Sequence, residues 1–203
     1  MRHPPSCILV SALLFAVAQT GRPELTFIAD ARPGTLIISR EAGDFEALGP
    51  EPRLGVTELE EASEYTTFPN VRLGVGWASQ ALYCDLAANA GYLLNERFRS
   101  PLLGVDAALL VRLRRNAAAG PHVGFLRITD PEWTGDADLD LDPASAFLFG
   151  IQIVIGYDIQ FVFAADYLSA EAMDVEAHNG WRTSDDSLDV SGLSLQFGIM
   201  GRF

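Results

Sequence analysis

Apolar and polar residues alternate along most of the chain with a period of two, the spacing at which side chains share one face of a β-strand. The longest example runs from Phe147 to Tyr167, where nearly every odd-numbered position is aliphatic or aromatic. Turn residues between Gly156 and Asp158 interrupt this run, which therefore predicts a hairpin. Comparable segments predict seven strands, at about 70–79, 81–94, 101–114, 119–129, 145–157, 158–169 and 190–203.

The polar faces of these strands decide between two β architectures. They carry charged residues opposite each apolar stripe, namely Arg72, Asp85, Asp106, Arg112, Arg114, Asp166 and Arg202. A soluble antiparallel sandwich also alternates, but its outer face normally carries Lys, Glu and Thr. Here the polar faces are mostly Gly, Ala, Asn and Gln, which suit the crowded interior of a narrow barrel where Arg and Asp pair. We therefore favour an all-β, antiparallel up-and-down transmembrane barrel with these charges as a luminal polar network, and keep the sandwich as the alternative.

A closed barrel of this kind needs an even number of strands, so one strand is missing from the seven. Two upstream segments could supply it: residues 53–65, which are acidic for a membrane strand, and residues 23–40. The expected division is a signal peptide at 1–18, an N-terminal segment at 19–52 that is an extra strand or a periplasmic arm, and a barrel at 53–203.

The first residues have the layout of a secretory signal peptide. Arg2 precedes an apolar run from Cys7 to Val17, and Ala16 to Ala18 offer a small-residue cleavage site. The run is too short to cross a bilayer as a helix, and the alternative is a buried core helix. Export would leave Cys84 as the only cysteine, which excludes an internal disulfide.

Net charge limits the partners. The chain carries a formal charge of −13, whereas binding to nucleic acid requires a basic surface. The same charge argues against docking on an anionic membrane surface as a peripheral protein. No phosphate-binding loop, metal-ligand pair or redox motif is present in the sequence, so no cofactor is expected.

One acidic segment could bind a hard cation. Carboxylates alternate at Asp136, Asp138, Asp140 and Asp142, so an extended backbone places all four on one face. Calcium takes several such oxygen ligands, but the glycine and closing glutamate of an EF-hand loop are missing. A solvated acidic loop is the preferred interpretation.

A hydrolytic site is the weakest candidate. His178 could be combined with Asp174 and with Ser169 or Ser184. No nucleophile elbow surrounds any of them, so the preferred interpretation is a surface histidine in a loop. His122, near a turn, carries no signal of its own.

The segments "LSLQFGIMGRF", "FGIQIVIGYDIQFVFAADY" and "RFRSPLLGVDAALLV" together resemble the small outer-membrane β-barrel proteins of Gram-negative bacteria. The resemblance implies a monomeric eight-stranded barrel surrounded by outer-membrane lipid and lipopolysaccharide. It also implies insertion by the barrel assembly machinery, which reads the last strand. On this interpretation the insertion signal consists of Leu195, Phe197, Ile199 and Phe203.

These inferences favour a non-enzymatic outer-membrane barrel with a lumen filled by side chains and a structural or surface-interaction role. Two alternatives stay open. One is a lipid A-modifying barrel enzyme, although the sequence lacks the His-x-Ser pairing of the deacylases it would resemble. The other is a secreted soluble barrel that binds a small apolar ligand in its interior.

Overall fold

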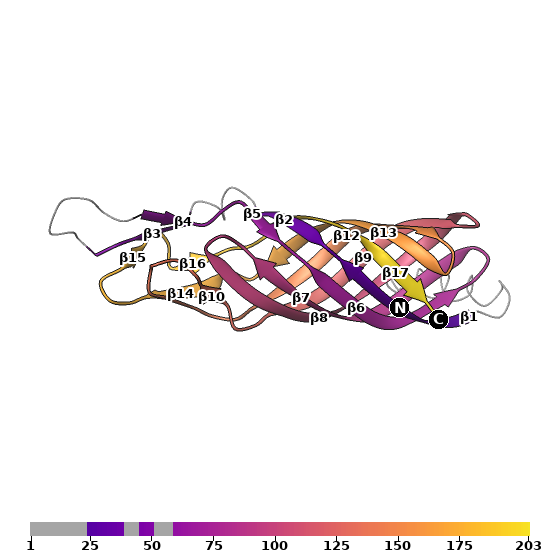
Figure 1. Ribbon diagram of the computed structural model, residues 1–203, viewed down its shortest axis with the longest axis horizontal. Coiled ribbons are helices and arrows are strands. Elements are labelled where there is room, and N and C mark those ends of the chain that lie inside the picture. Colours follow the sequence, from indigo (N-terminus) through magenta and orange to yellow (C-terminus); the bar gives the residue numbers. More distant parts are fainter. Residues whose placement is uncertain (1–23, 39–44, 51–58) are drawn as a thin grey trace, which may run out of the picture.

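The computed structural model describes residues 24–38, 45–50 and 59–203 (Figure 1), so the expected signal peptide at 1–18 lies outside the described residues. The described residues contain strands, turns and loops. Among them no helix is long and apolar enough to cross a membrane. The strands are β1 (Glu24–Arg32), β2 (Gly34–Ile38), β3 (Glu46–Leu48), β4 (Leu59–Glu61), β5 (Tyr65–Thr67), β6 (Asn70–Ala78), β7 (Leu82–Leu94), β8 (Phe98–Arg114), β9 (Ala117–Ile128), β10 (Glu132–Trp133), β11 (Leu139–Leu141), β12 (Ala144–Gly156), β13 (Ile159–Ala170), β14 (Met173–Ala177), β15 (Arg182–Thr183), β16 (Ser187–Leu188) and β17 (Gly192–Arg202).

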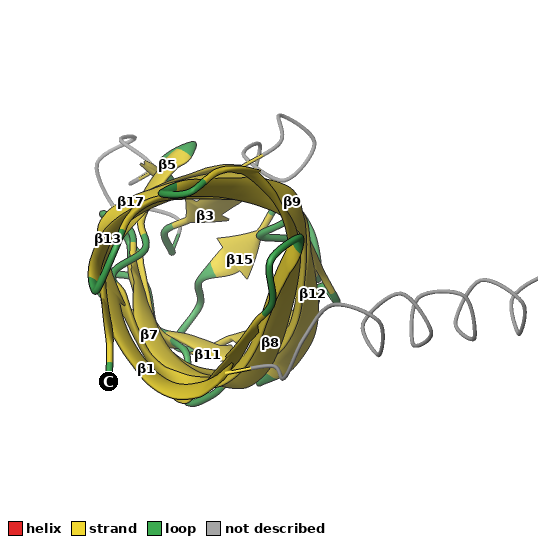
Figure 2. Ribbon diagram, turned by 90° about the vertical axis from the view of Figure 1, so that its right-hand side faces the viewer, coloured by secondary structure: helices red, strands yellow, loops and turns green. Residues whose placement is uncertain are grey.

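The longer strands close into an antiparallel barrel, seen along its axis in Figure 2. Its wall has eight strands. β1 and β2 together form one of them, β5 and β6 together form another, and the other six are β7, β8, β9, β12, β13 and β17. Each pairs with the next, and β17 completes the ring by pairing with β1 and β2. In this ring Ala29 lies opposite Leu73 on one side and Gly201 on the other. The predicted fold class, an up-and-down barrel of about eight strands, is confirmed.

The first wall strand comes from the upstream segment 23–40, since β1 and β2 pair with β6 and β5. The barrel wall therefore begins at Glu24, upstream of residue 53. Of the other candidate, residues 53–65, the structure describes 59–65; this part enters the wall at Tyr65 and contributes the separate short strand β4. Pro33 divides β1 from β2 because proline has no N–H for the ladder. The ladder resumes on both sides, with Phe68 N–H donating to the Gly34 carbonyl at 2.8 Å.

Large apolar side chains cover the outside of every wall strand. Exposed examples are Phe27, Leu73, Leu86, Val105, Phe125, Phe149, Phe163 and Phe197. Cys84 also lies on the outward side of β7, between inward Tyr83 and Asp85. An apolar surface of this extent is unfavourable in water and is the surface that lipid requires.

The two ends of the barrel differ in their connections. At one end, called the short-turn end, the chain turns at residues 79–81, 115–116 and 157–158, and β1 begins and β17 finishes there (Figure 1). Gly156 precedes the last of these turns at a φ of 143°, and a Cβ on it would meet the Ile159 carbonyl oxygen at 2.2 Å. A side chain there would therefore strain the predicted hairpin.

Long connections meet at the opposite end of the barrel. We call residues 45–50, 59–64, 129–143 and 171–191 the loop cap. They contain the short strands β3, β4, β10, β11, β14, β15 and β16. Figure 1 shows β3, β4, β14, β15 and β16 at the end of the barrel opposite the C-terminus. Strand pairing links connections that are distant in sequence, because β11 pairs with β14 and β3 pairs with β15. The cap is thus a folded extension of the barrel.

Candidate functional site: a luminal charge network and the loop cap

Arg72 is the centre of the polar interior. It lies on the inward face of β6 and is 1% exposed. Its guanidinium donates to Asp30 at 2.7 Å, to Asp85 at 2.9 Å and to Asp106 at 2.9 Å, with a second contact to the other Asp106 oxygen. The three carboxylates come from β1, β7 and β8, so one side chain links three wall strands. The planar fork of arginine suits this geometry, since it presents several N–H groups in fixed directions.

Further polar side chains extend the network around the lumen. Arg32 donates to Asp30 through two nitrogens, at 2.8 and 3.1 Å. Asn89 donates to Asp106 at 3.1 Å. On the other side of the lumen, His122 Nδ1 lies 3.0 Å from Asp166, and its Nε2 lies 3.6 Å from Asp106. The imidazole therefore connects Asp166 with the aspartates held by Arg72.

The structure brings together four of the seven residues predicted for the luminal network: Arg72, Asp85, Asp106 and Asp166. The other three, Arg112, Arg114 and Arg202, line the opening at the short-turn end and form no ion pair within the described chain. They were predicted for the interior of the barrel, and they lie at its open end instead of beside Arg72.

The predicted network lacked four of its members: Asp30, Arg32, Asn89 and His122. Asp30 lies on the face opposite apolar Phe27, Ala29 and Ala31. It belongs to segment 23–40, which the sequence offers as only one of two candidates for the missing strand. His122 could not be assigned to the network from the sequence, because a single histidine does not indicate which other strands its side chain faces.

Apolar layers enclose the network on both sides. Toward the short turns lie Ile28, Leu110, Val154, Val162 and Met200, all buried. Toward the loop cap lies a larger buried cluster that includes Leu36, Phe68, Leu93, Phe98, Leu102, Leu126, Leu148 and Leu168. This cluster continues into the cap through Leu139, Met173 and Val190. The lumen is therefore packed with side chains, and its charges are held between two apolar layers.

Glu60 joins two segments of the loop cap, its own and residues 129–143, to the turn between β7 and β8. It is 5% exposed. Its carboxylate accepts the Trp133 indole N–H at 2.9 Å and the backbone N–H groups of Asp136 and Ala137 at 2.8 and 3.3 Å, and it pairs with Arg97 at 3.2 Å. Burial by itself would raise the pKa of Glu60, but these donors outweigh it, and the pKa lies below its ordinary value.

A glycine allows this arrangement. A Cβ on Gly135 would lie 2.0 Å from the Glu60 carboxylate, so no side chain can occupy that position while Glu60 stays in place. The sequence marks Glu60 only as one member of an acidic run, and its partners lie 37 to 77 residues further along the chain.

The acidic row has the predicted face but no assembled ion site. Its four carboxylates, Asp136, Asp138, Asp140 and Asp142, are exposed, whereas the residues between them are buried. His178 lies 3.1 Å from the Asp140 carboxylate, and Asn179 donates to Asp138. Within the described residues, no group of three or more His, Cys, Asp or Glu side chains is arranged to hold a metal ion.

The structure does not assemble the imagined hydrolytic triad. His178 pairs with Asp140, and its Nε2 therefore faces neither Asp174 nor a serine. Ser184 Oγ instead accepts the Glu46 N–H at 2.9 Å, which ties β3 to the segment after β15.

The proposed insertion row faces outward. Leu195, Phe197 and Ile199 are exposed, and Phe203 is 78% exposed. Between them Ser194 and Gln196 are buried in the lumen and hydrogen-bonded to each other at 3.1 Å. Whether the assembly machinery reads this row stays a prediction.

Neither the comparison with family models nor that with curated proteins gives a match. Similar solved structures include the outer membrane protein OprG from Pseudomonas aeruginosa, 11% identical over 90% of this chain and 98% of that chain, with a TM-score of 0.43. Neisserial surface protein A is 12% identical over 89% of this chain and 99% of that one, with a TM-score of 0.46. The translocator domain of the autotransporter NalP from Neisseria meningitidis is 10% identical over 98% of this chain and 96% of that one, with a TM-score of 0.42. These values assign neither a family nor a function. The chain's own topology and apolar outer surface are those of a small transmembrane β-barrel.

Proposed function

We propose that this protein is an integral outer-membrane barrel that conducts no solutes and serves a structural or surface-interaction role through its loop cap. In this arrangement the short turns face the periplasm and the long connections face outside, as is usual for bacterial barrels. The barrel anchors the protein in the membrane, and the loop cap is the part exposed to partners outside the cell.

The filled lumen is the observation that carries this proposal. An ion that entered would have to pass two packed apolar layers and displace partners of the Arg72 network. Both steps are unfavourable, because an ion loses its water in an apolar layer and a broken buried pair leaves an uncompensated charge. An eight-stranded barrel has room for little more than its own side chains.

The organisation of the cap supports a role in presentation. Its short strands pair with each other, and Glu60 ties residues 59–64 to residues 129–143. Its buried side chains belong to the same apolar cluster as the part of the lumen next to the cap. A pre-ordered surface loses less conformational entropy on binding a partner than mobile loops do. The acidic row on its exposed face favours basic or cationic partners.

The two other functions have less support. A lipid A-modifying enzyme needs a serine and a histidine in contact, and the described His122 and His178 pair with aspartates instead. A soluble carrier needs a polar exterior and an empty interior, whereas this barrel has an apolar exterior and a packed lumen.

The test is single-channel recording on purified, folded protein in planar bilayers. Folding is verified by the shift in gel mobility between unboiled and boiled samples. We expect no stable conductance from the folded form. A large, long-lived conductance would contradict the closed lumen, and a change in lipid A mass on overexpression would favour the enzyme.

A further inference from the structure

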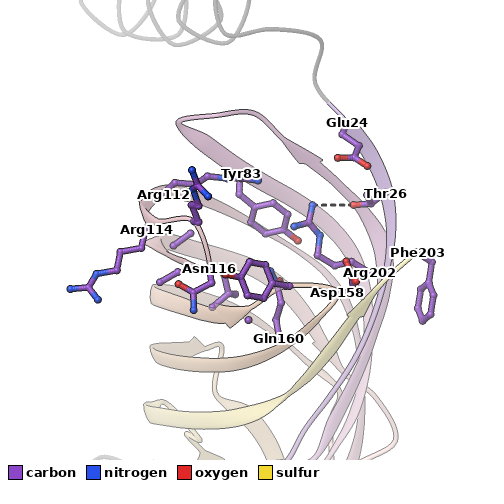
Figure 3. Close-up of a pocket in the computed structure, with 16 residues that line it drawn as sticks. Glu24, Thr26, Tyr83, Arg112, Arg114, Asn116, Asp158, Gln160, Arg202 and Phe203 are labelled. Carbon is purple, nitrogen blue, oxygen red and sulfur yellow. Dashed lines mark hydrogen bonds between the residues drawn. The ribbon is translucent and has the colours of Figure 1, made fainter.

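The opening at the short-turn end contains a polar cavity of about 370 Å³ (Figure 3). Its walls are the ends of β1, β7, β8, β9, β12, β13 and β17 and the turns at 115–116 and 157–158. The apolar layer around Val154 and Met200 closes it toward the lumen. It is therefore a blind pocket that opens only away from the loop cap.

Positive side chains dominate this pocket. Four arginines line it, Arg112, Arg114, Arg115 and Arg202, together with the carboxylates of Glu24 and Asp158. Its side chains therefore sum to about +2 in a chain whose formal charge is −13. None of the four arginines is ion-paired with a described residue, whereas Arg32, Arg72, Arg97 and Arg99 all are.

Donors without a strong protein partner line the wall of the pocket. Arg202 Nε is buried and has no hydrogen-bond partner in the described chain, and its Nη2 reaches Thr26 only at 3.4 Å. Tyr83 is 2% exposed, yet its hydroxyl contacts only the Met200 sulfur, at 3.8 Å. The Arg202 guanidinium lies over the Tyr83 ring at 4.7 Å, and Figure 3 shows the two side chains next to each other.

We propose that this pocket binds a phosphate-bearing anion. The donors of Tyr83, Arg112 and Arg202 come from three strands, β7, β8 and β17. Donors on several sides of one cavity suit a tetrahedral group with three or more accepting oxygens better than a planar carboxylate. Arginine also binds phosphate oxygens in pairs, and its bonds to an anion are stronger than those between neutral groups. Binding would supply the partner that Arg202 Nε lacks.

Two sources could provide this chemistry at the periplasmic surface, a soluble phosphate compound and the phosphodiester of an anionic phospholipid. The probes are inorganic phosphate, measured by titration calorimetry on folded protein in detergent, and phosphatidylglycerol, counted as retained lipid by native mass spectrometry. Phosphatidylcholine, added in the same detergent, serves as the zwitterionic comparison. We expect saturable binding of one anion per barrel for at least one of the first two probes.

Three variants test the assignment: Arg112→Gln, Arg202→Gln and Tyr83→Phe. Loss of one charged hydrogen bond should weaken binding of the anion about tenfold or more for each arginine, and less for the tyrosine. Arg127→Gln is the matched control, because Arg127 lies on the outer surface near the loop cap and donates only to Ser145. It should bind the probe as the wild-type protein does.

Binding of phosphatidylglycerol alone would identify a lipid site, and binding of inorganic phosphate a site for soluble anions. Absence of saturable binding of both, or equal binding by wild type and both arginine variants, would overturn the proposal. Unboiled gel mobility confirms that each variant is folded. The result is independent of the conductance test, because the pocket lies outside the layer that closes the lumen.

Discussion

At the scale of single residues, the interior of the barrel depends on Arg72. One guanidinium pairs with three buried aspartates that come from three different strands. A buried charge that loses its partner is far more costly than an exposed one, since the remaining charges stay in a medium of low polarity. Lysine would not substitute, because its single ammonium cannot present the same fork of donors.

Replacing Arg72 by methionine should therefore lower the free energy of unfolding by about 3–5 kcal/mol. The change keeps most of the side-chain volume and removes the charge. The measurement is urea unfolding of the folded barrel in lipid vesicles, followed by tryptophan fluorescence. Arg127→Met is the control and should change the free energy by about 0.5 kcal/mol or less, because Arg127 is exposed. Equal unfolding midpoints for the two variants would contradict the central role of Arg72.

At the scale of elements, β17 shows how one strand serves two environments. Its odd-numbered side chains Leu193 to Ile199 face outward, and its even-numbered side chains Ser194 to Met200 are buried in the lumen. The alternation follows directly from the pleat of the strand. A change of residue type should therefore have opposite consequences on the two faces.

Leu195→Arg should destabilise the folded barrel by about 2–4 kcal/mol, since the outer face of the wall contacts hydrocarbon. Leu59→Arg is the control, because Leu59 is similarly exposed but belongs to β4 in the loop cap. The same unfolding measurement compares them. If both substitutions were equally tolerated, the outer face of β17 would not lie in lipid.

The loop cap is an element whose stability should depend on pH. The pKa of Glu60 is lowered, so its carboxylate stabilises the cap fully above the ordinary glutamate pKa, about 4.3. That contribution is lost as the pH falls through the lower pKa of the folded state. The amide NMR signals of Asp136 and Ala137, which donate to Glu60, should report a midpoint below about 4.3. Glu60→Gln should abolish that transition, and a midpoint above the ordinary value would contradict the described contacts.

At the scale of the whole molecule, closure of the barrel joins the first and last wall strands. Phe27 and Phe203 exchange two backbone hydrogen bonds of 3.0 Å at the short-turn end. The wall cannot close until β17 meets β1, whatever order the other strands pair in. A substitution in β17 can therefore reduce the amount of closed barrel by more than the loss of that residue's own contacts would.

Phe203→Asp should reduce the amount of folded protein in the outer membrane far more than it reduces synthesis or export. The outward aromatic side chain would be lost from the interfacial end of the closing strand. Tyr157→Asp is the matched control, because Tyr157 is an exposed aromatic at the same end but lies in a turn. Outer-membrane abundance and unboiled gel mobility measure the effect. Equal amounts of folded Phe203→Asp and wild-type protein would reject the insertion-signal hypothesis.

Most of the wall could be predicted from the sequence because the pleat of a strand is a local property. The alternation predicts strands at residues 101–114 and 145–157, and the structure has β8 at Phe98–Arg114 and β12 at Ala144–Gly156. The first wall strand was harder to recognise. Pro33 interrupts its pattern, and only pairing with β17 and with β6 shows that it belongs to the barrel.

The sequence by itself determined which face of each strand carries the charges, since alternation places Arg72, Asp85 and Arg202 on the polar side whatever the strand's neighbours. Only the tertiary structure decided how deep each residue lies and what it meets. Arg72 faces three aspartates in the middle of the lumen, whereas Arg202 has the same parity but lies at the open end. Depth depends on the stagger between strands around the closed ring, a property of the whole barrel that no single segment encodes.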